Sequence, residues 1–214
     1  MKIKTPSWVR ESGMTGSALK FSAAYFVFMI ACIAVVLYFR LIPWNQMGIR
    51  LDTLPLGILV GVLCQVPLQL LSILRLKNRA TFTEERRKQI EEIAKHARTH
   101  GMSGAFDAPV AELFWSGIVL SSIVVFLAYV GLPSLVAGLL GVIVGTGLHV
   151  LSHLLPPLRH LVGEKWWEFY LVMALNRLAF IISGNIVAPI IGHVLLSWIP
   201  LLMYRATGVT DRIL

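Results

Sequence analysis

Four residues capable of metal chemistry lie inside apolar stretches of this chain: Glu112, His149, His153 and His193. His149 and His153 are at positions i and i+4, so on a helix both rings lie on one face. With His193 they could ligate one divalent metal such as zinc, and Glu112 could be a fourth ligand or the base that activates a bound water. The alternative is structural, with His149 bonded to a nearby hydroxyl such as Thr146 and His153 lying at the membrane interface.

Other polar residues share these apolar stretches. Ionisable groups at such depth usually face the interior of a helix bundle and pair, because a carboxylate at a membrane helix centre costs about 2.5–3.5 kcal/mol. Arg177 needs a counter-charge, and Glu112 is the only acid expected within the spans, so a buried network of Glu112, Arg177 and Asn176 is a second, structural interpretation. Gln65 and Gln69 flank Pro67 and are expected to hydrogen-bond between helices or to the carbonyl that the proline frees.

The composition indicates whether the chain folds in water or in a membrane. Of 214 residues, 57% are hydrophobic and only 14% charged, with a mean hydropathy of +0.75. Soluble domains carry about 25% charged residues. We therefore predict an all-α, polytopic membrane helix bundle in a lipid bilayer. Six apolar runs are long enough to cross it, at about 18–39, 54–74, 109–131, 133–155, 167–182 and 184–203.

The distribution of Lys and Arg predicts the orientation. With six spans, Arg40 and Arg50 fall on one side and Arg177 lies within a span, whereas the other sixteen of the nineteen basic residues fall on the opposite side. Basic residues are enriched in cytoplasmic loops, so we expect both termini in the cytoplasm. The net charge of +8 is then a topology signal, and it gives no reason to expect nucleic-acid binding. We expect the protein to lie in the inner (plasma) membrane of a prokaryote.

The chain divides into three parts by hydropathy. Residues 1–108 form an N-terminal two-span region whose polar stretch, 75–101, has the capping and charge pattern of a cytoplasmic amphipathic helix. Residues 109–204 form a four-helix core, and 205–214 a short cytoplasmic tail. Cys32 and Cys64 lie within apolar runs and are expected to pack there without forming a disulfide.

Three segments of the core resemble motifs of the CPBP family, the CAAX-protease and bacteriocin-processing group of intramembrane metallopeptidases. The family pattern has an "EExxxRG" helix, then "FxxxH", then a helix containing "APIxxHxxxN". The corresponding stretches here are "AELFWSG" at 111–117, "HVLSH" at 149–153 and "SGNIVAPIIGHVLLS" at 183–197. The resemblance covers about 109–198 and implies a CPBP-like membrane fold.

The catalytic positions of the family are only partly kept. The resemblance places Glu112 on the second glutamate, His153 on the histidine of the second motif and His193 on that of the third. The first glutamate, which activates water in the family, is Ala111, and the oxyanion asparagine is Ser197. Loss of one oxyanion donor typically lowers the rate by about 10²–10³, which a serine hydroxyl at 197 could partly restore.

Three functions remain open from the sequence. The first is a proteolytically inactive CPBP-fold protein, a pseudoenzyme that acts as an accessory or partner-binding subunit of a membrane complex. The second is an active intramembrane metallopeptidase that uses His149, His153 and His193 for the metal, Glu112 as base and Ser197 as oxyanion donor. The third is a subunit that binds a haem or chlorophyll-type cofactor through one of the histidines.

Overall fold

The protein is all-helical in the part of the chain that its computed structural model describes, residues 16–77, 106–154 and 166–206, with side chains placed over 21–67, 106–154, 166–167 and 169–196. The helices are α2 (Gly16–Phe39), α3 (Leu54–Lys77), η2 (Leu113–Leu120), α5 (Ser121–Tyr129), α6 (Ser134–Leu154), α8 (Trp166–Ser183) and α9 (Val187–Ala206). No strand occurs in these residues, which confirms the all-α prediction. The predicted 75–101 helix and the tail lie mostly outside the described residues.

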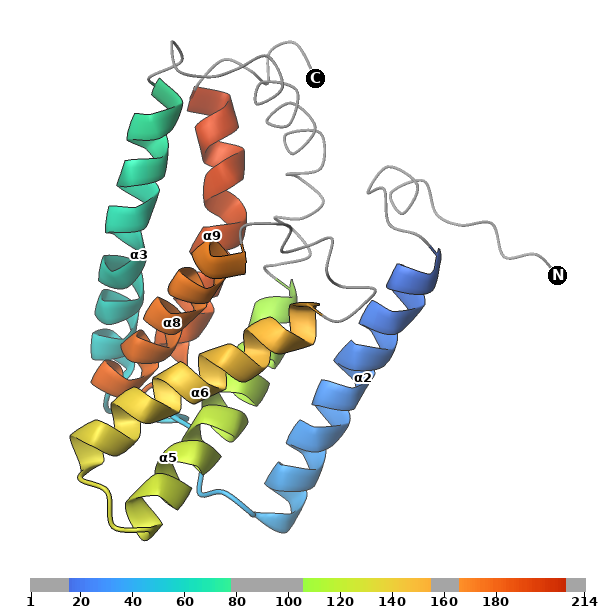
Figure 1. The fold of residues 1–214 in the computed structure, drawn as a ribbon, viewed down its shortest axis with the longest axis vertical. Helices are drawn as coiled ribbons and strands as arrows, with labels where there is room; N and C mark the ends of the chain where they lie inside the picture. Colours follow the sequence, from blue (N-terminus) through green and yellow to red (C-terminus); the bar gives the residue numbers. More distant parts are fainter. Residues whose placement is uncertain (1–15, 78–105, 155–165, 207–214) are drawn as a thin grey trace, which may run out of the picture.

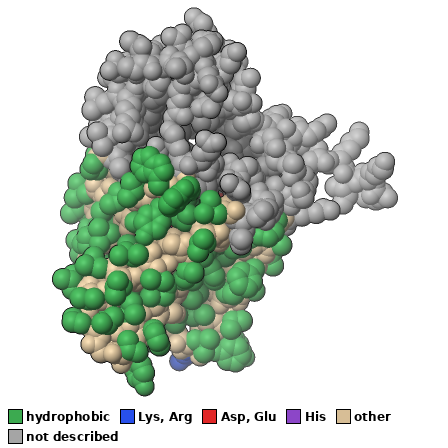
Figure 2. Space-filling model, viewed as in Figure 1, with side chains coloured by type: hydrophobic (Ala, Val, Ile, Leu, Met, Phe, Trp, Pro, Cys, Tyr) green, Lys and Arg blue, Asp and Glu red, His purple; other side chains and the backbone are tan. Residues whose placement is uncertain are grey.

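The predicted apolar runs coincide with these helices, with ends that differ by at most three residues. Three helices are long and apolar enough to cross a membrane, over Phe21–Phe39, Phe106–Tyr129 and Ser134–Leu154. The visible surface of the described part is mostly hydrophobic, with few charged side chains (Figure 2). These features are those of a protein embedded in a lipid bilayer.

The helix over Phe106–Tyr129 is the centre of the bundle. It begins as an α-helix, widens into the π-helical segment η2 and continues as α5. One face of η2 packs against α2, and other contacts reach α6 and α8. Figure 1 shows α2 standing on one side of this helix, with α3, α8 and α9 grouped on the other. Buried polar side chains on η2 can therefore meet residues from several helices.

Small residues allow α3 and α9 to approach closely. A Cβ added to Gly61 would lie 2.6 Å from the carbonyl oxygen of Ala188, and one added to Gly57 would lie 3.0 Å from the Cβ of Asn185. Close backbone approach at small residues is typical of helix pairs in membranes, where packing rather than the hydrophobic effect favours association. Residues with larger side chains at 57 and 61 would push α3 away from α9.

The connections at one end of the bundle are held by specific hydrogen bonds. Gly131 and Gly184 have positive φ (94° and 61°) and end α5 and α8, and the side chain of Asn185 then accepts a bond from the backbone N–H of Val187 (2.9 Å) at the start of α9. The loop over 40–53 lies against this turn, because the N–H of Ile186 donates to the carbonyl of Gly48 (2.9 Å).

Candidate functional site

A group of buried and half-buried polar side chains, here called the polar centre, lies where the Phe106–Tyr129 helix meets α6, α8 and α9. It contains Glu112 and Ser116 from the first helix, His149 and His153 from α6, Arg177 from α8 and His193 from α9. Glu112 and Arg177 are both 0% exposed. Residues from four helices that are far apart in sequence therefore share one buried region.

Both carboxylate oxygens of Glu112 have a partner. Oε1 lies 2.9 Å from Nδ1 of His193, and Oε2 accepts a hydrogen bond from the Ser116 hydroxyl at 2.6 Å. A carboxylate accepts only, so Nδ1 of His193 carries a proton. This arrangement stabilises a buried carboxylate, because a charge removed from water needs hydrogen bonds and an opposite charge.

Arg177 makes its hydrogen bonds to His149 and to the backbone. Its Nη2 lies 2.7 Å from Nδ1 of His149, and its Nη1 donates to the carbonyl of Met173 at 3.0 Å. Because arginine donates only, Nδ1 of His149 must accept, so His149 is neutral and carries its proton on Nε2. In the described structure the arginine is thus bonded to His149, and the bonds of Glu112 go to His193 and Ser116.

Aromatic rings enclose the two α6 histidines. His149 stacks on Trp115 with ring centroids 4.6 Å apart and an interplanar angle of 18°, and Phe169 lies 5.7 Å away on another side. His153 packs edge-on against His149 at 4.8 Å and contacts Phe169 at 5.0 Å. Nδ1 of His153 is 3.1 Å from the carbonyl of His149, so this ring is also held by local contacts.

Asn176 belongs to a neighbouring contact between three helices. Nε2 of Gln65 on α3 donates to Oδ1 of Asn176 on α8, and both residues are buried. Gly192 on α9 lies directly against the Asn176 amide, where a Cβ would collide with Oδ1. Gln65 thus bonds between helices, as one of the two sequence interpretations proposed. The side chains of Gln69 and Ser197 lie outside the described residues.

The sequence reasoning missed three residues of this region. Asp107 lies inside the Phe106–Tyr129 helix, five residues before Glu112, because that helix begins before the apolar run. Ser116 bonds to Glu112, and its i+4 spacing from that residue was an available signal. Trp115 covers His149, and only the tertiary packing shows this.

The metal prediction can be compared with the donor geometry. Within the described ranges, no three His, Cys, Asp or Glu side chains are arranged so that they could hold a metal ion. Nδ1 of His149 faces the Arg177 guanidinium, which donates to it, and its Nε2 carries the proton. A site made of His149, His153 and His193 would need His149 to leave Arg177, and it stays a prediction.

The chain was compared with protein-family models, curated proteins and solved structures. None of the three comparisons finds a match. Functional inference for this protein therefore depends on the sequence and on the geometry of the polar centre.

Proposed function

We propose that this chain is a six-span integral membrane protein with both termini in the cytoplasm and a CPBP-like fold. In this proposal it does not cleave peptide bonds, and it acts as an accessory, partner-binding subunit of a membrane complex. The polar centre then serves to hold four helices in one arrangement.

Helix lengths support six spans. Besides the three helices named above, α3 has 24 residues, α9 has 20 and α8 has 18. At 1.5 Å per residue these lengths correspond to about 36, 30 and 27 Å, against a hydrocarbon thickness of about 30 Å. The α2–α3 loop and the α8–α9 turn lie at the same end of the bundle, since Ile186 bonds to Gly48, as expected if the four helices between these connections each cross the membrane once.

The proposal that the protein does not cleave peptide bonds rests on Glu112, whose two carboxylate oxygens are both hydrogen-bonded within the protein. A general base must reach the water that it activates, but both oxygens of this carboxylate are already bonded, to His193 and to Ser116. The preceding residue is Ala111, whose methyl side chain cannot act as a general base. Glu112 therefore acts as an acceptor between helices.

The hydrogen bonding of the His149 ring also favours a structural role for the polar centre over metal binding. A metal ligand must offer a lone pair, whereas Nδ1 of His149 accepts from Arg177 and Nε2 carries the proton. A guanidinium 2.7 Å from the ring nitrogen also opposes the approach of a cation. The pair instead links α6 to α8.

One observation favours the second candidate, an altered metallopeptidase. The contact of Glu112 with Nδ1 of His193 joins residues of the first and third motifs. Proteins commonly orient a metal-ligating histidine by bonding its other ring nitrogen to a carboxylate. This candidate requires His149 to exchange Arg177 for a metal.

A pull-down from native membranes in mild detergent tests the proposal. We expect a stoichiometric integral membrane partner with the wild-type chain and with Glu112→Gln, and loss of that partner with Arg177→Ala. Metal analysis of the same preparations separates the candidates. About one equivalent of zinc, together with a peptidase activity that Glu112→Gln abolishes, would establish the metallopeptidase and reject the accessory subunit.

A further inference from the structure

We propose that α2 is a lateral lid over the polar centre, hinged at its C-terminal end and latched in its N-terminal half by the hydroxyl of Tyr25. Opening the lid would connect the centre with the lipid phase, so that a bilayer-dissolved molecule could reach it. This inference concerns access to the centre and holds whether the chain is an accessory subunit or a peptidase.

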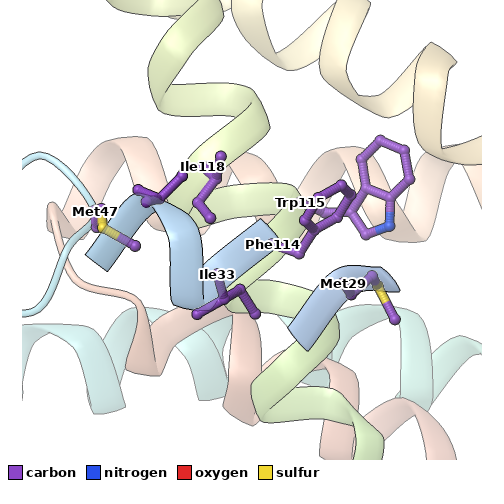
Figure 3. Packing of buried hydrophobic residues seen from close by; sticks show 7 residues of the cluster. Met29, Ile33, Met47, Phe114, Trp115 and Ile118 are labelled. Carbon is purple, nitrogen blue, oxygen red and sulfur yellow. The ribbon is translucent and has the colours of Figure 1, made fainter. Parts of the chain in front are cut away.

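The first support is how few of the described helices hold α2. Among them it packs chiefly against η2, through an apolar seam in which Met29 and Ile33 meet Phe114 and Ile118 (Figure 3). Lipid tails are as apolar as these side chains, so the hydrophobic effect does not hold such a seam closed in a membrane. Lipid can replace the contacts that α2 loses when it swings outward.

The second support is the latch. Nε1 of Trp115 donates to the Tyr25 hydroxyl oxygen at 3.1 Å, and this hydroxyl donates to Oγ of Ser152 at 3.4 Å. Among the described side chains of α2, only Tyr25 makes a hydrogen bond to another helix. One hydroxyl thus joins α2 to both the central helix and α6.

The third support is an anchored hinge at the C-terminal end of α2. The helix ends at Phe39, and Arg40 follows with φ of 51°, a left-handed conformation that breaks the helix direction. The loop beyond it is fixed to the bundle, since the Ser121 hydroxyl donates to the carbonyl of Gln46 at 2.7 Å and Ile186 bonds to Gly48. A rotation about residue 40 would leave this loop in place and move the N-terminal half of α2 most.

The polar centre lies directly behind the latch. Tyr25 bonds to Trp115, Trp115 stacks on His149, and His149 bonds to Arg177. Moving α2 outward would therefore uncover Trp115 first and the histidine–arginine pair next. These successive contacts place α2 over the polar centre, and not over a purely apolar part of the bundle.

Distances between spin labels in the full chain, reconstituted in lipid, test the lid. In a background carrying Cys32→Ala and Cys64→Ala, labels at Ala23→Cys and Leu151→Cys report the latch end, and labels at Ala34→Cys and Leu151→Cys report the hinge end; all three label positions are exposed. Tyr25→Phe keeps the ring and removes the latch. We expect the population with a longer 23–151 distance to rise at least about fivefold, as the loss of both hydrogen bonds of this hydroxyl predicts. The 34–151 distance should lengthen only about a third as much, because residue 34 is six residues from the hinge and residue 23 is seventeen.

The control is Tyr38→Phe, which removes a hydroxyl from an exposed tyrosine on the same helix and should change neither distance. An unchanged 23–151 distance in Tyr25→Phe would overturn the proposal. So would an equal lengthening at Ala34, because α2 would then detach as a whole without a hinge. Thermal unfolding of each variant confirms that the measured molecules are folded.

Discussion

Glu112 and His193 form a direct pair, with Oε1 of the carboxylate 2.9 Å from Nδ1 of the imidazole. The residues are on different helices, and the pair joins the centre of the bundle to α9. Arg177 is bonded to His149, so the polar centre contains two pairs, and neither is the Glu112–Arg177 pair that was one of the interpretations open from the sequence.

The Glu112–His193 pair is expected to stabilise the fold. Glu112→Ala should lower the free energy of unfolding by about 3–5 kcal/mol, because it removes the buried carboxylate that pairs with His193 and accepts from Ser116. Glu112→Gln keeps an acceptor oxygen and should cost less. A double-mutant cycle with His193→Ala, measured by unfolding in detergent, should give a coupling of about 1–3 kcal/mol; strictly additive effects would show that the two residues do not interact.

Arg177 and His149 can be tested as a second pair. Arg177→Met should destabilise the protein by about 2–4 kcal/mol, since it leaves Nδ1 of His149 buried without a donor. Adding His149→Phe should recover part of this loss, because removing both partners leaves no unpaired polar group. If the double variant is less stable than Arg177→Met alone, His149 has a partner more important than the arginine.

The close contact of α3 with α9 predicts a contrast between two glycines. Gly61→Ala places a methyl group 2.6 Å from a backbone oxygen of Ala188 and should lower stability by about 1–3 kcal/mol, as overpacking does. At Gly147, a Cβ meets nothing within 4 Å, so Gly147→Ala is the matched control. This substitution should leave the free energy of unfolding unchanged or raise it by less than about 1 kcal/mol, so the melting temperature should not fall.

The proposed topology predicts which loops an impermeant reagent can reach. In the background without native cysteines, Asn45→Cys lies in the exposed loop over 40–53 and should react with a charged maleimide added to intact cells. Lys88→Cys lies in the basic stretch that the sequence assigns to the cytoplasm, and it should react only after the cells are permeabilised. The reverse pattern would invert the orientation, and reaction of both in intact cells would change the span count.

The helical framework could be predicted from the sequence, because a bilayer requires long apolar helices whose backbone groups bond internally. The apolar runs therefore predicted the described helices to within three residues at each end. Asp107 was missed because the helix extends beyond the apolar run that marks it, so hydropathy alone placed this acid in a loop.

The sequence by itself determined which polar residues are costly in the membrane and the order of the helices that carry them. Only the tertiary structure decided which of these residues pair. The depth of a residue along its helix follows from its number. The neighbour that its side chain faces depends on how each helix is rotated about its axis. The π-helical segment η2 changes this rotation just after Glu112. Packing therefore bonds Glu112 to His193 and Ser116, and Arg177 to His149, although charge alone favoured a Glu112–Arg177 pair.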